Sequence, residues 1–166
     1  MPGDRILTMT PVYPPFYHVI QDNGRVIVES PLIRDENGYY TIDFENLEAS
    51  IDSRTKMMLL CNPHNPAGRV WSREELLKLA AIAKRHDLVV VSDEIHADFV
   101  YSGHRHIPIA SLSEDMKMRT ITAYAPSKTF NLAGLVQSYA VIPNPRLMGA
   151  FTAVYDALHL NSNIFG

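Results

Sequence analysis

Short apolar runs rich in β-forming residues alternate with helix-like patterns along the chain, and this alternation limits the possible folds more than any other feature. The runs with the length and composition of strands are Arg5 to Met9, Arg25 to Glu29, Met57 to Cys61, Leu88 to Ser92, Thr120 to Tyr124 and Ser138 to Ile142. They are apolar almost throughout, as expected for a parallel sheet covered on both faces by helices. We therefore expect an α/β fold with three layers, α/β/α, and a mostly parallel sheet.

The helical segments carry their own signals. The clearest lies between Ser72 and His86, where Ser72 and Glu75 have the spacing of a capping box. A second helix is expected from about Asp43 to Ile51. A third, near the C-terminus, has apolar residues at helical spacing, namely Leu147, Met148, Phe151, Val154, Tyr155 and Leu158.

Length, charge and cysteine content exclude several classes of protein. The chain has 166 residues and a formal net charge of −3, which fits one domain and gives no electrostatic basis for binding nucleic acid or anionic membranes. Its apolar runs fall far short of the roughly 20 residues that a membrane span needs. The single cysteine, Cys61, favours a reducing compartment, so we expect a cytoplasmic protein.

Four polar clusters follow predicted strands directly. They contain Tyr13, the segment from Asn62 to Gly68, the segment from Asp93 to Asp98, and Ser127 with Lys128. Because the carboxyl ends of parallel strands meet at one edge of the sheet, and ligands bind at that edge in open α/β sheets, we expect these clusters to converge on one site.

Each residue also has an explanation without function. Lys128 could be a desolvated amine that attacks carbonyls, or a lysine that simply reaches solvent. Asp93 is costly to bury after an apolar strand unless it is paired, but it could also cap a helix. Asn65 could be a turn former and Tyr13 a core aromatic. Together, a lysine, an aspartate, an asparagine and a tyrosine have a specific meaning for pyridoxal 5'-phosphate (PLP), which needs a Schiff-base lysine and an acidic partner for its ring nitrogen.

Three segments of the chain resemble a known family. The strings CNPHNPAGRVW, SDEIHADFVY and APSKTFNLAGL resemble fold-type I PLP-dependent enzymes of the aminotransferase class I/II superfamily. The motifs NPHNP, SDEIHADF and SKTFNLAGL are most similar to those of its C–S lyase branch, the MalY/PatB type cystathionine β-lyases. The resemblance runs from PGDR to NSNIFG and implies the central part of the large PLP-binding domain.

The resemblance implies a role for each polar residue. Lys128 would form the Schiff base with PLP and later move the proton at the substrate α-carbon. Asp93 would pair with the pyridinium nitrogen, and Asn65 would bond the phenolic oxygen. Tyr13 would stack on the ring as a further catalytic residue.

Other positions concern binding of the PLP phosphate and the choice between the lyase branch and the aminotransferases. Ser127 would contact the phosphate, and His96 would stand where aminotransferases commonly have a tyrosine near the phenolic oxygen. Ala125 replaces a frequent Ser or Thr phosphate ligand, and Val136 stands where many aminotransferases have a phosphate-binding arginine. The missing arginine favours the lyase branch.

The resemblance also implies that residues 1–166 form only part of the large domain. The N-terminal arm, the segment with the glycine-rich phosphate loop, and the small domain with its carboxylate-binding arginine are expected to be absent. This piece should bind PLP weakly and not complete a turnover alone. Its strand from Ser138 to Ile142 would be left as an exposed edge, and the full-length parent would be a homodimer.

The leading hypothesis is a PLP-dependent carbon–sulfur β-lyase acting on a sulfur-containing amino acid, with products thiol, pyruvate and ammonia. A class I/II aminotransferase is the alternative within the superfamily. A non-catalytic interaction or regulatory module is the alternative from another class. A metal site built from Asp93, Glu94, His96 and Asp98, with His104 and His106 nearby, is less favoured because alternating side chains on an extended segment point to opposite sides.

Overall fold

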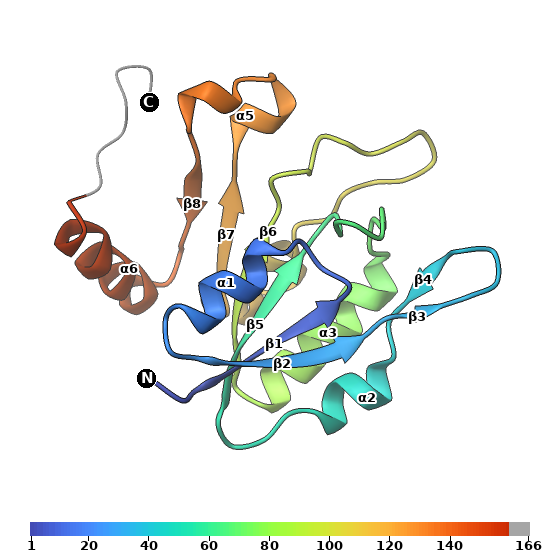
Figure 1. Cartoon of the computed structure of the whole chain (residues 1–166), viewed down its shortest axis with the longest axis horizontal. Helices are drawn as coiled ribbons and strands as arrows, with labels where there is room; N and C mark the ends of the chain where they lie inside the picture. The colour runs from blue at the N-terminus through green and yellow to red at the C-terminus, as the bar shows by residue number, and fades with distance from the viewer. Residues whose placement is uncertain (160–166) are drawn as a thin grey trace.

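A six-stranded sheet runs through the middle of the molecule (Figure 1), in a computed structural model that describes residues 1–159. Its strands, in spatial order, are β2 (Val26–Pro31), β1 (Arg5–Thr10), β5 (Thr55–Cys61), β6 (Val89–Asp93), β7 (Thr120–Tyr124) and β8 (Tyr139–Val141). All neighbours are parallel except β7 and β8. The predicted mostly parallel sheet is confirmed, with each predicted strand present. The NSNIFG end of the family resemblance lies outside the described residues.

Helices connect these strands. They are α1 (Pro15–Gln21), α2 (Phe44–Ala49), α3 (Arg73–Arg85), α4 (Glu114–Arg119), α5 (Pro126–Thr129) and α6 (Pro145–Ala157), with two 3₁₀ turns, η1 (Ile109–Leu112) and η2 (Ala133–Leu135). The predicted capping box is present at α3, since Ser72 Oγ accepts from the Glu75 amide (3.2 Å) and Glu75 Oε2 accepts from the Ser72 amide (2.7 Å). No helix within residues 1–159 is long and apolar enough to cross a membrane.

Three short helices and a hairpin were not predicted. The segment YPPFY leads into α1, where Pro15 fits because the first helical residue needs no N–H donor. Helices α4 and α5 are too short to show a helical period. The two-residue strands β3 (Ile33–Arg34) and β4 (Tyr40–Thr41) form a separate antiparallel pair.

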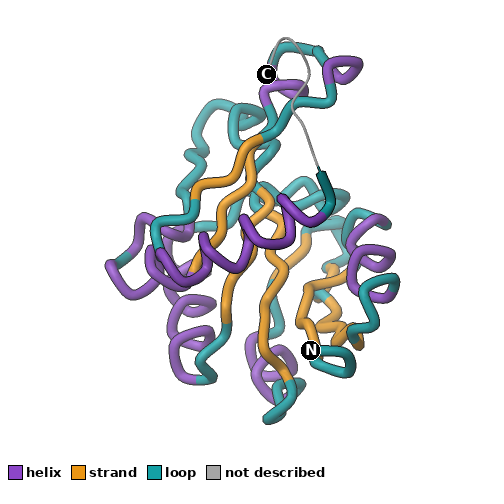
Figure 2. Tube along the Cα trace, turned by 90° about the vertical axis from the view of Figure 1, so that its left-hand side faces the viewer, coloured by secondary structure: helices purple, strands orange, loops and turns teal. Residues whose placement is uncertain are grey.

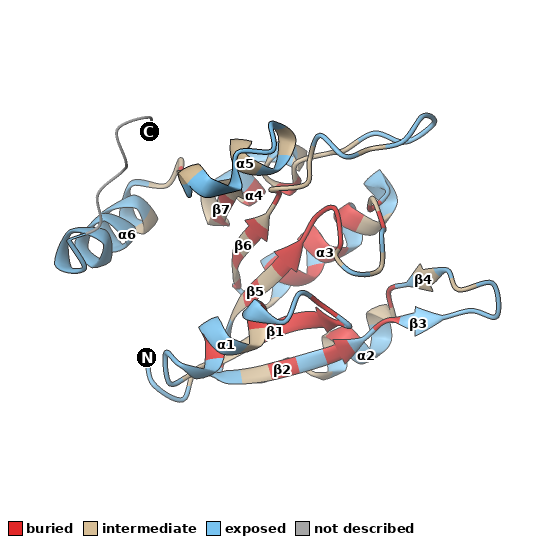
Figure 3. Ribbon diagram, turned by 45° about the horizontal axis from the view of Figure 1, so that its top comes forward, coloured by how far each residue is buried: buried red, intermediate tan, exposed pale blue. Residues whose placement is uncertain are grey.

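The helices cover the two faces of the sheet unequally. The main core lies between one face and the elements α2, α3, α4 and η1, with residues such as Leu60, Leu79 and Val90 almost fully buried. On the other face only a small cluster forms, where Phe16 of α1 packs with Val12 and Cys61. Figures 2 and 3 show α6 beside the sheet with its surface largely exposed. Helices therefore lie on both faces of the sheet, as expected for an α/β/α fold, although one face is covered less than the other among residues 1–159.

Candidate active site

The polar clusters predicted from the sequence meet at the carboxyl edge of the sheet. A small cavity of about 40 Å³ lies there, lined by Tyr13, Cys61, Asn65, Asp93, Ile95, His96 and Lys128. These residues follow or end β1, β5, β6 and β7, which are neighbours in the sheet. Parallel strands thus bring together side chains from positions 13 to 128, as the predicted convergence requires.

Asp93 is the last residue of β6 and is only partly accessible. Burial raises the pKa of its carboxyl group, and this is opposed by the Ile95 amide, which donates to Oδ1 at 3.2 Å, and by the positive charges of His96 and Lys128. Within residues 1–159 no hydrogen bond reaches the other oxygen, Oδ2. The carboxylate is therefore free to accept a cationic N–H donor from a ligand, which would offset its loss of hydration.

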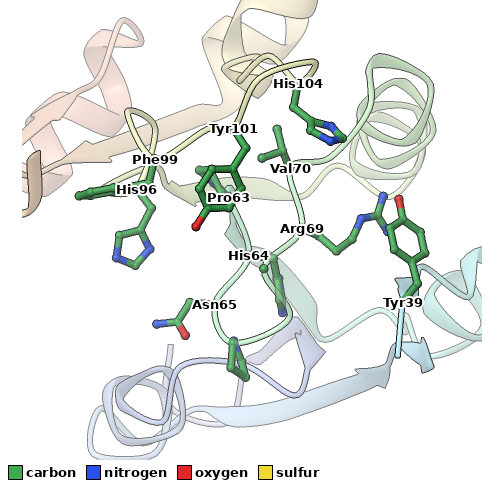
Figure 4. Close-up of a pocket in the computed structure, with 12 residues that line it drawn as sticks. Tyr39, Pro63, His64, Asn65, Arg69, Val70, His96, Phe99, Tyr101 and His104 are labelled. Atoms are coloured by element: carbon green, nitrogen blue, oxygen red, sulfur yellow. The ribbon is translucent and has the colours of Figure 1, made fainter. Parts of the chain in front are cut away.

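Asn65 lies in the loop after β5, which two polar contacts hold in place. Its backbone N–H donates to Cys61 Sγ (3.3 Å), and the neighbouring His64 places Nε2 2.8 Å from the Pro11 carbonyl oxygen. Its side-chain amide makes no hydrogen bond to another described residue, and Figure 4 shows it on the same side of the loop as the His96 ring. Asn65 therefore has a free amide to offer a ligand.

Cys61 itself is buried, and burial raises its pKa to about 12. Its thiol is therefore protonated at neutral pH and is not a nucleophile.

Lys128 reaches the cavity from α5, directly after β7. Lys128 is exposed in this structure, which agrees with a lysine that reaches solvent and not with a desolvated amine. The helix is tied to the turn after β6 because Thr129 Oγ1 donates to Asp98 Oδ2 at 2.6 Å. The adjacent Ser127 does not line the cavity, and its role as a phosphate contact stays a prediction.

Tyr13 follows β1 and precedes α1, and 42% of its surface is exposed. Its phenol makes no hydrogen bond to another residue of the described chain. The ring forms one wall of the cavity, so it is available to stack on a planar ligand.

A second, larger hollow, which was not predicted, lies next to this cavity. It has a volume of about 440 Å³ and shares Asn65 and His96 with the smaller cavity. Arg69 lines its far wall, but this guanidinium is already paired with Glu75 at 2.8 Å and lies over the Tyr39 ring. The larger pocket therefore has mainly aromatic, imidazole and apolar walls.

The residues of the less favoured metal site make other contacts. Glu94 is fully buried and is bonded to His106 (2.8 Å), while Asp93 faces the cofactor cavity. Across residues 1–159 no group of three or more His, Cys, Asp or Glu side chains could hold a metal ion. The signal for the Glu94 contact was available in the sequence, since a carboxylate next to a buried strand end needs a partner, but its partner could not be named.

The donor set fits PLP. A partly buried carboxylate with a free oxygen, a lysine amine, an unpaired amide and an exposed aromatic ring surround one cavity. These are the groups that a positively charged pyridine ring with an aldehyde and a phenolic oxygen requires. Fold and site together define an α/β domain with a cavity at the carboxyl edge of its sheet, lined by a lysine and an aspartate.

Comparison with known proteins identifies the family. The family model described as Aminotransferase class I and II matches residues 1–164. The chain belongs to this family.

Relatives within the family include C–S lyases. The chain is 50% identical to cystathionine beta-lyase PatB of Bacillus subtilis over 153 residues, which cover 92% of this chain and 39% of PatB. Among solved structures, cystalysin from Treponema denticola, which contains PLP, matches with a TM-score of 0.91 and 46% identity over 94% of this chain and 40% of its own. The PLP-bound C–S lyase from Staphylococcus hominis matches with a TM-score of 0.88 and 38% identity, over 99% of this chain and 41% of its own. The chain thus spans about two-fifths of the length of these relatives.

Proposed function

We propose that this chain carries the cofactor-binding residues of a PLP-dependent carbon–sulfur β-lyase. The observation that carries the proposal is the cavity at the sheet edge. Asp93, at the end of β6, and Lys128, after the neighbouring strand β7, both line it. Its similarity to cystathionine beta-lyase PatB supports the lyase branch.

PLP, when bound, withdraws electrons from the substrate α-carbon. Lys128 would bind the aldehyde carbon of the cofactor and, once displaced by the substrate amine, would take the α-proton on Nζ. Its exposed position at the cavity mouth leaves the amine free to approach a substrate. Loss of the α-proton and of the sulfur on the β-carbon releases a thiol, and hydrolysis of the remaining product gives pyruvate and ammonia.

Asp93 would hold the ring nitrogen in its protonated form. Its Oδ2 is free of other donors in the described chain, and the positive ring would counter the desolvation that now raises the pKa of the carboxyl group. Opposite charges at this depth keep the proton on the ring nitrogen.

The remaining residues would orient the cofactor. Asn65 and His96 would donate to the phenolic oxygen, and Tyr13 would stack on the ring, all three lining the cavity. Ser127, which does not line the cavity itself, would contact the phosphate.

A class I/II aminotransferase is the second candidate, and the family description favours keeping it. The absence of an arginine at Val136, which is 87% exposed, leaves less positive charge for the phosphate and favours the lyase. A non-catalytic interaction module is the remaining alternative, and it predicts no cofactor at Lys128.

At the scale of the whole protein, residues 1–166 would form part of the large cofactor domain. We propose a cytoplasmic homodimer acting on a sulfur-containing amino acid, with no nucleic-acid or membrane partner. The lone, buried Cys61 is compatible with a reducing compartment.

The test is an assay of the protein that carries this chain with L-cystathionine and PLP, in the absence of any keto acid. A lyase releases thiol, pyruvate and ammonia in equal amounts, and Lys128→Ala abolishes all three. Transamination that needs an added keto acid and exceeds elimination would overturn the lyase in favour of the aminotransferase.

A further inference from the structure

The residue directly after Asp93, Glu94, has a fully buried carboxylate that has no part in the proposed chemistry. Four groups hydrogen-bond to its oxygens, namely the Ser92 hydroxyl (2.9 Å), the Ile109 amide (3.3 Å), the Tyr124 hydroxyl (2.8 Å) and His106 Nε2 (2.8 Å). A carboxylate has about four acceptor positions, so this group is fully satisfied as an acceptor. Losing it would leave several buried donors unpaired.

The Glu94–His106 contact closes a loop at its base. The Glu94 backbone N–H donates to the Ala123 carbonyl oxygen (2.9 Å), which fixes the start of the loop on β7, and the side-chain bond fixes its end. Residues 95–105 between these points contain no regular helix or strand. Phe99 and Tyr101 in this loop are 55% and 89% exposed, so their side chains contribute little to holding it, and the bond from Thr129 to Asp98 (2.6 Å) is a further tether on the loop.

This loop forms one wall of the 440 Å³ pocket. His96, Phe99, Tyr101 and His104 line it from the loop, and Figure 4 shows Tyr101 pointing toward Pro63 of the loop that carries Asn65. Since Asn65 and His96 also line the cofactor cavity, a substrate held there can extend from one hollow into the other.

The chemistry of the pocket fits a thioether chain. Its described lining contains no carboxylate, and the Arg69 guanidinium is already neutralised by Glu75. Aromatic rings at the wall make favourable contacts with divalent sulfur. A flexible chain with sulfur and methylene groups therefore suits this space better than a strongly charged group.

We propose that Glu94 and His106 are positioning residues, which hold loop 95–105 as the outer wall of a pocket for the part of a thioether amino acid beyond its β-carbon. The identity of the ligand rests on the proposed function. The dependence of the loop on Glu94 does not.

The first experiment measures amide hydrogen exchange of the chain without cofactor, by mass spectrometry. In Glu94→Gln and in His106→Gln, residues 95–105 are expected to exchange about tenfold faster while β5 and α3 keep wild-type protection. Glu48→Gln is the matched control, because Glu48 forms the same kind of pair with His86 (2.9 Å) away from the site. Loop exchange unchanged in both variants, or equal acceleration throughout the chain in both, would overturn the positioning role.

The second experiment follows the absorbance of PLP bound to the chain during titration with L-methionine and L-alanine. Neither amino acid has a leaving group on its β-carbon, so neither is consumed by β-elimination. The wild type is expected to prefer methionine, and Phe99→Ala and His106→Gln are expected to reduce this preference about tenfold without changing alanine affinity.

Glu48→Gln should keep the wild-type preference. Equal affinity for both amino acids in the wild type, or a preference unchanged in Phe99→Ala, would overturn the pocket. If no cofactor attaches to Lys128, the proposed function is wrong, and so is the assignment of the pocket to a thioether amino acid. The hydrogen-exchange experiment still decides the role of Glu94 in that case.

Discussion

At the scale of single residues, the cavity contains a group that lowers the stability of the fold but can bind a ligand. Asp93 ends an apolar strand, and its carboxylate loses hydration that the charges of His96 and Lys128 offset only in part. Sites of this kind are commonly less stable than the fold could make them, because the unfavourable group is completed by its ligand. Asp93 is thus the residue where cofactor binding and stability should oppose each other.

This opposition has a pH signature. Because burial raises the Asp93 pKa above 3.8, the folded state binds the proton more tightly than the unfolded state. The free energy of unfolding therefore falls as pH rises from 3.8 through the raised pKa, and the loss is complete above it. We expect Asp93→Asn, without cofactor, to be more stable than wild type at pH 7 and to lose this dependence, as measured by urea unfolding between pH 4 and 8.

The exposed Asp22→Asn is the control and should follow the wild-type curve. An Asp93→Asn variant that is less stable than wild type at pH 7 would contradict this account of the site. With PLP present the order should reverse, since the variant lacks the charge for the ring nitrogen.

At the scale of elements, local signals decide where helices start. The capping box at α3 satisfies two backbone N–H groups, and Glu75 also pairs with Arg69 beside the larger pocket. The buried face of this helix, which includes Leu76 and Leu79, fills the main core. The cap therefore supports both the core and one pocket wall.

Ser72→Ala is expected to lower the free energy of unfolding by about 1 kcal/mol, because the Glu75 amide loses its acceptor. Chemical denaturation followed through the single tryptophan, Trp71, measures this change. Ser53→Ala, at an exposed serine whose hydroxyl makes no bond within the described chain, should change stability by less than about 0.5 kcal/mol. Equal effects of the two substitutions would argue against the cap.

Local sequence patterns at the scale of elements also determine which parts of the structure can be predicted. Apolar runs such as Thr120 to Tyr124 fix strands because their pattern reflects burial, and Ser72 with Glu75 is a local signal that needs no tertiary contact. The convergence of Tyr13, Asp93 and Lys128 followed from strand direction alone. The Glu94–His106 contact and the larger pocket could not be predicted, since both depend on how irregular loops return to the sheet.

At the scale of the whole molecule, one side of the sheet lacks partners among residues 1–159. β8 is an edge strand with Val141 45% exposed. Phe151 (42%) and Val154 (61%) of α6 and its C-cap residue Leu158 (62%) are exposed as well. Contiguous apolar surface and an unpaired strand edge favour association with another chain.

We therefore expect the isolated chain to self-associate as its concentration rises. Val141→Lys on the edge strand and Val154→Glu on α6 should each shift sedimentation toward the monomer, because a charge opposes burial of these surfaces. Val19→Lys, at a 54% exposed residue of α1, is the control and should leave association unchanged. A chain that stays monomeric at every concentration would contradict this prediction.

The central claim is that Lys128 and Asp93 form a PLP site at the carboxyl edge of the sheet. It is tested most directly by adding PLP to the chain, reducing with borohydride and locating the attached cofactor by peptide mass spectrometry. We predict attachment at Lys128 in clear excess over Lys56, Lys78, Lys84 and Lys117, with the excess lost in Asp93→Ala and kept in Lys84→Ala. Equal attachment at all lysines, or an excess at Lys128 that survives Asp93→Ala, would contradict the claim.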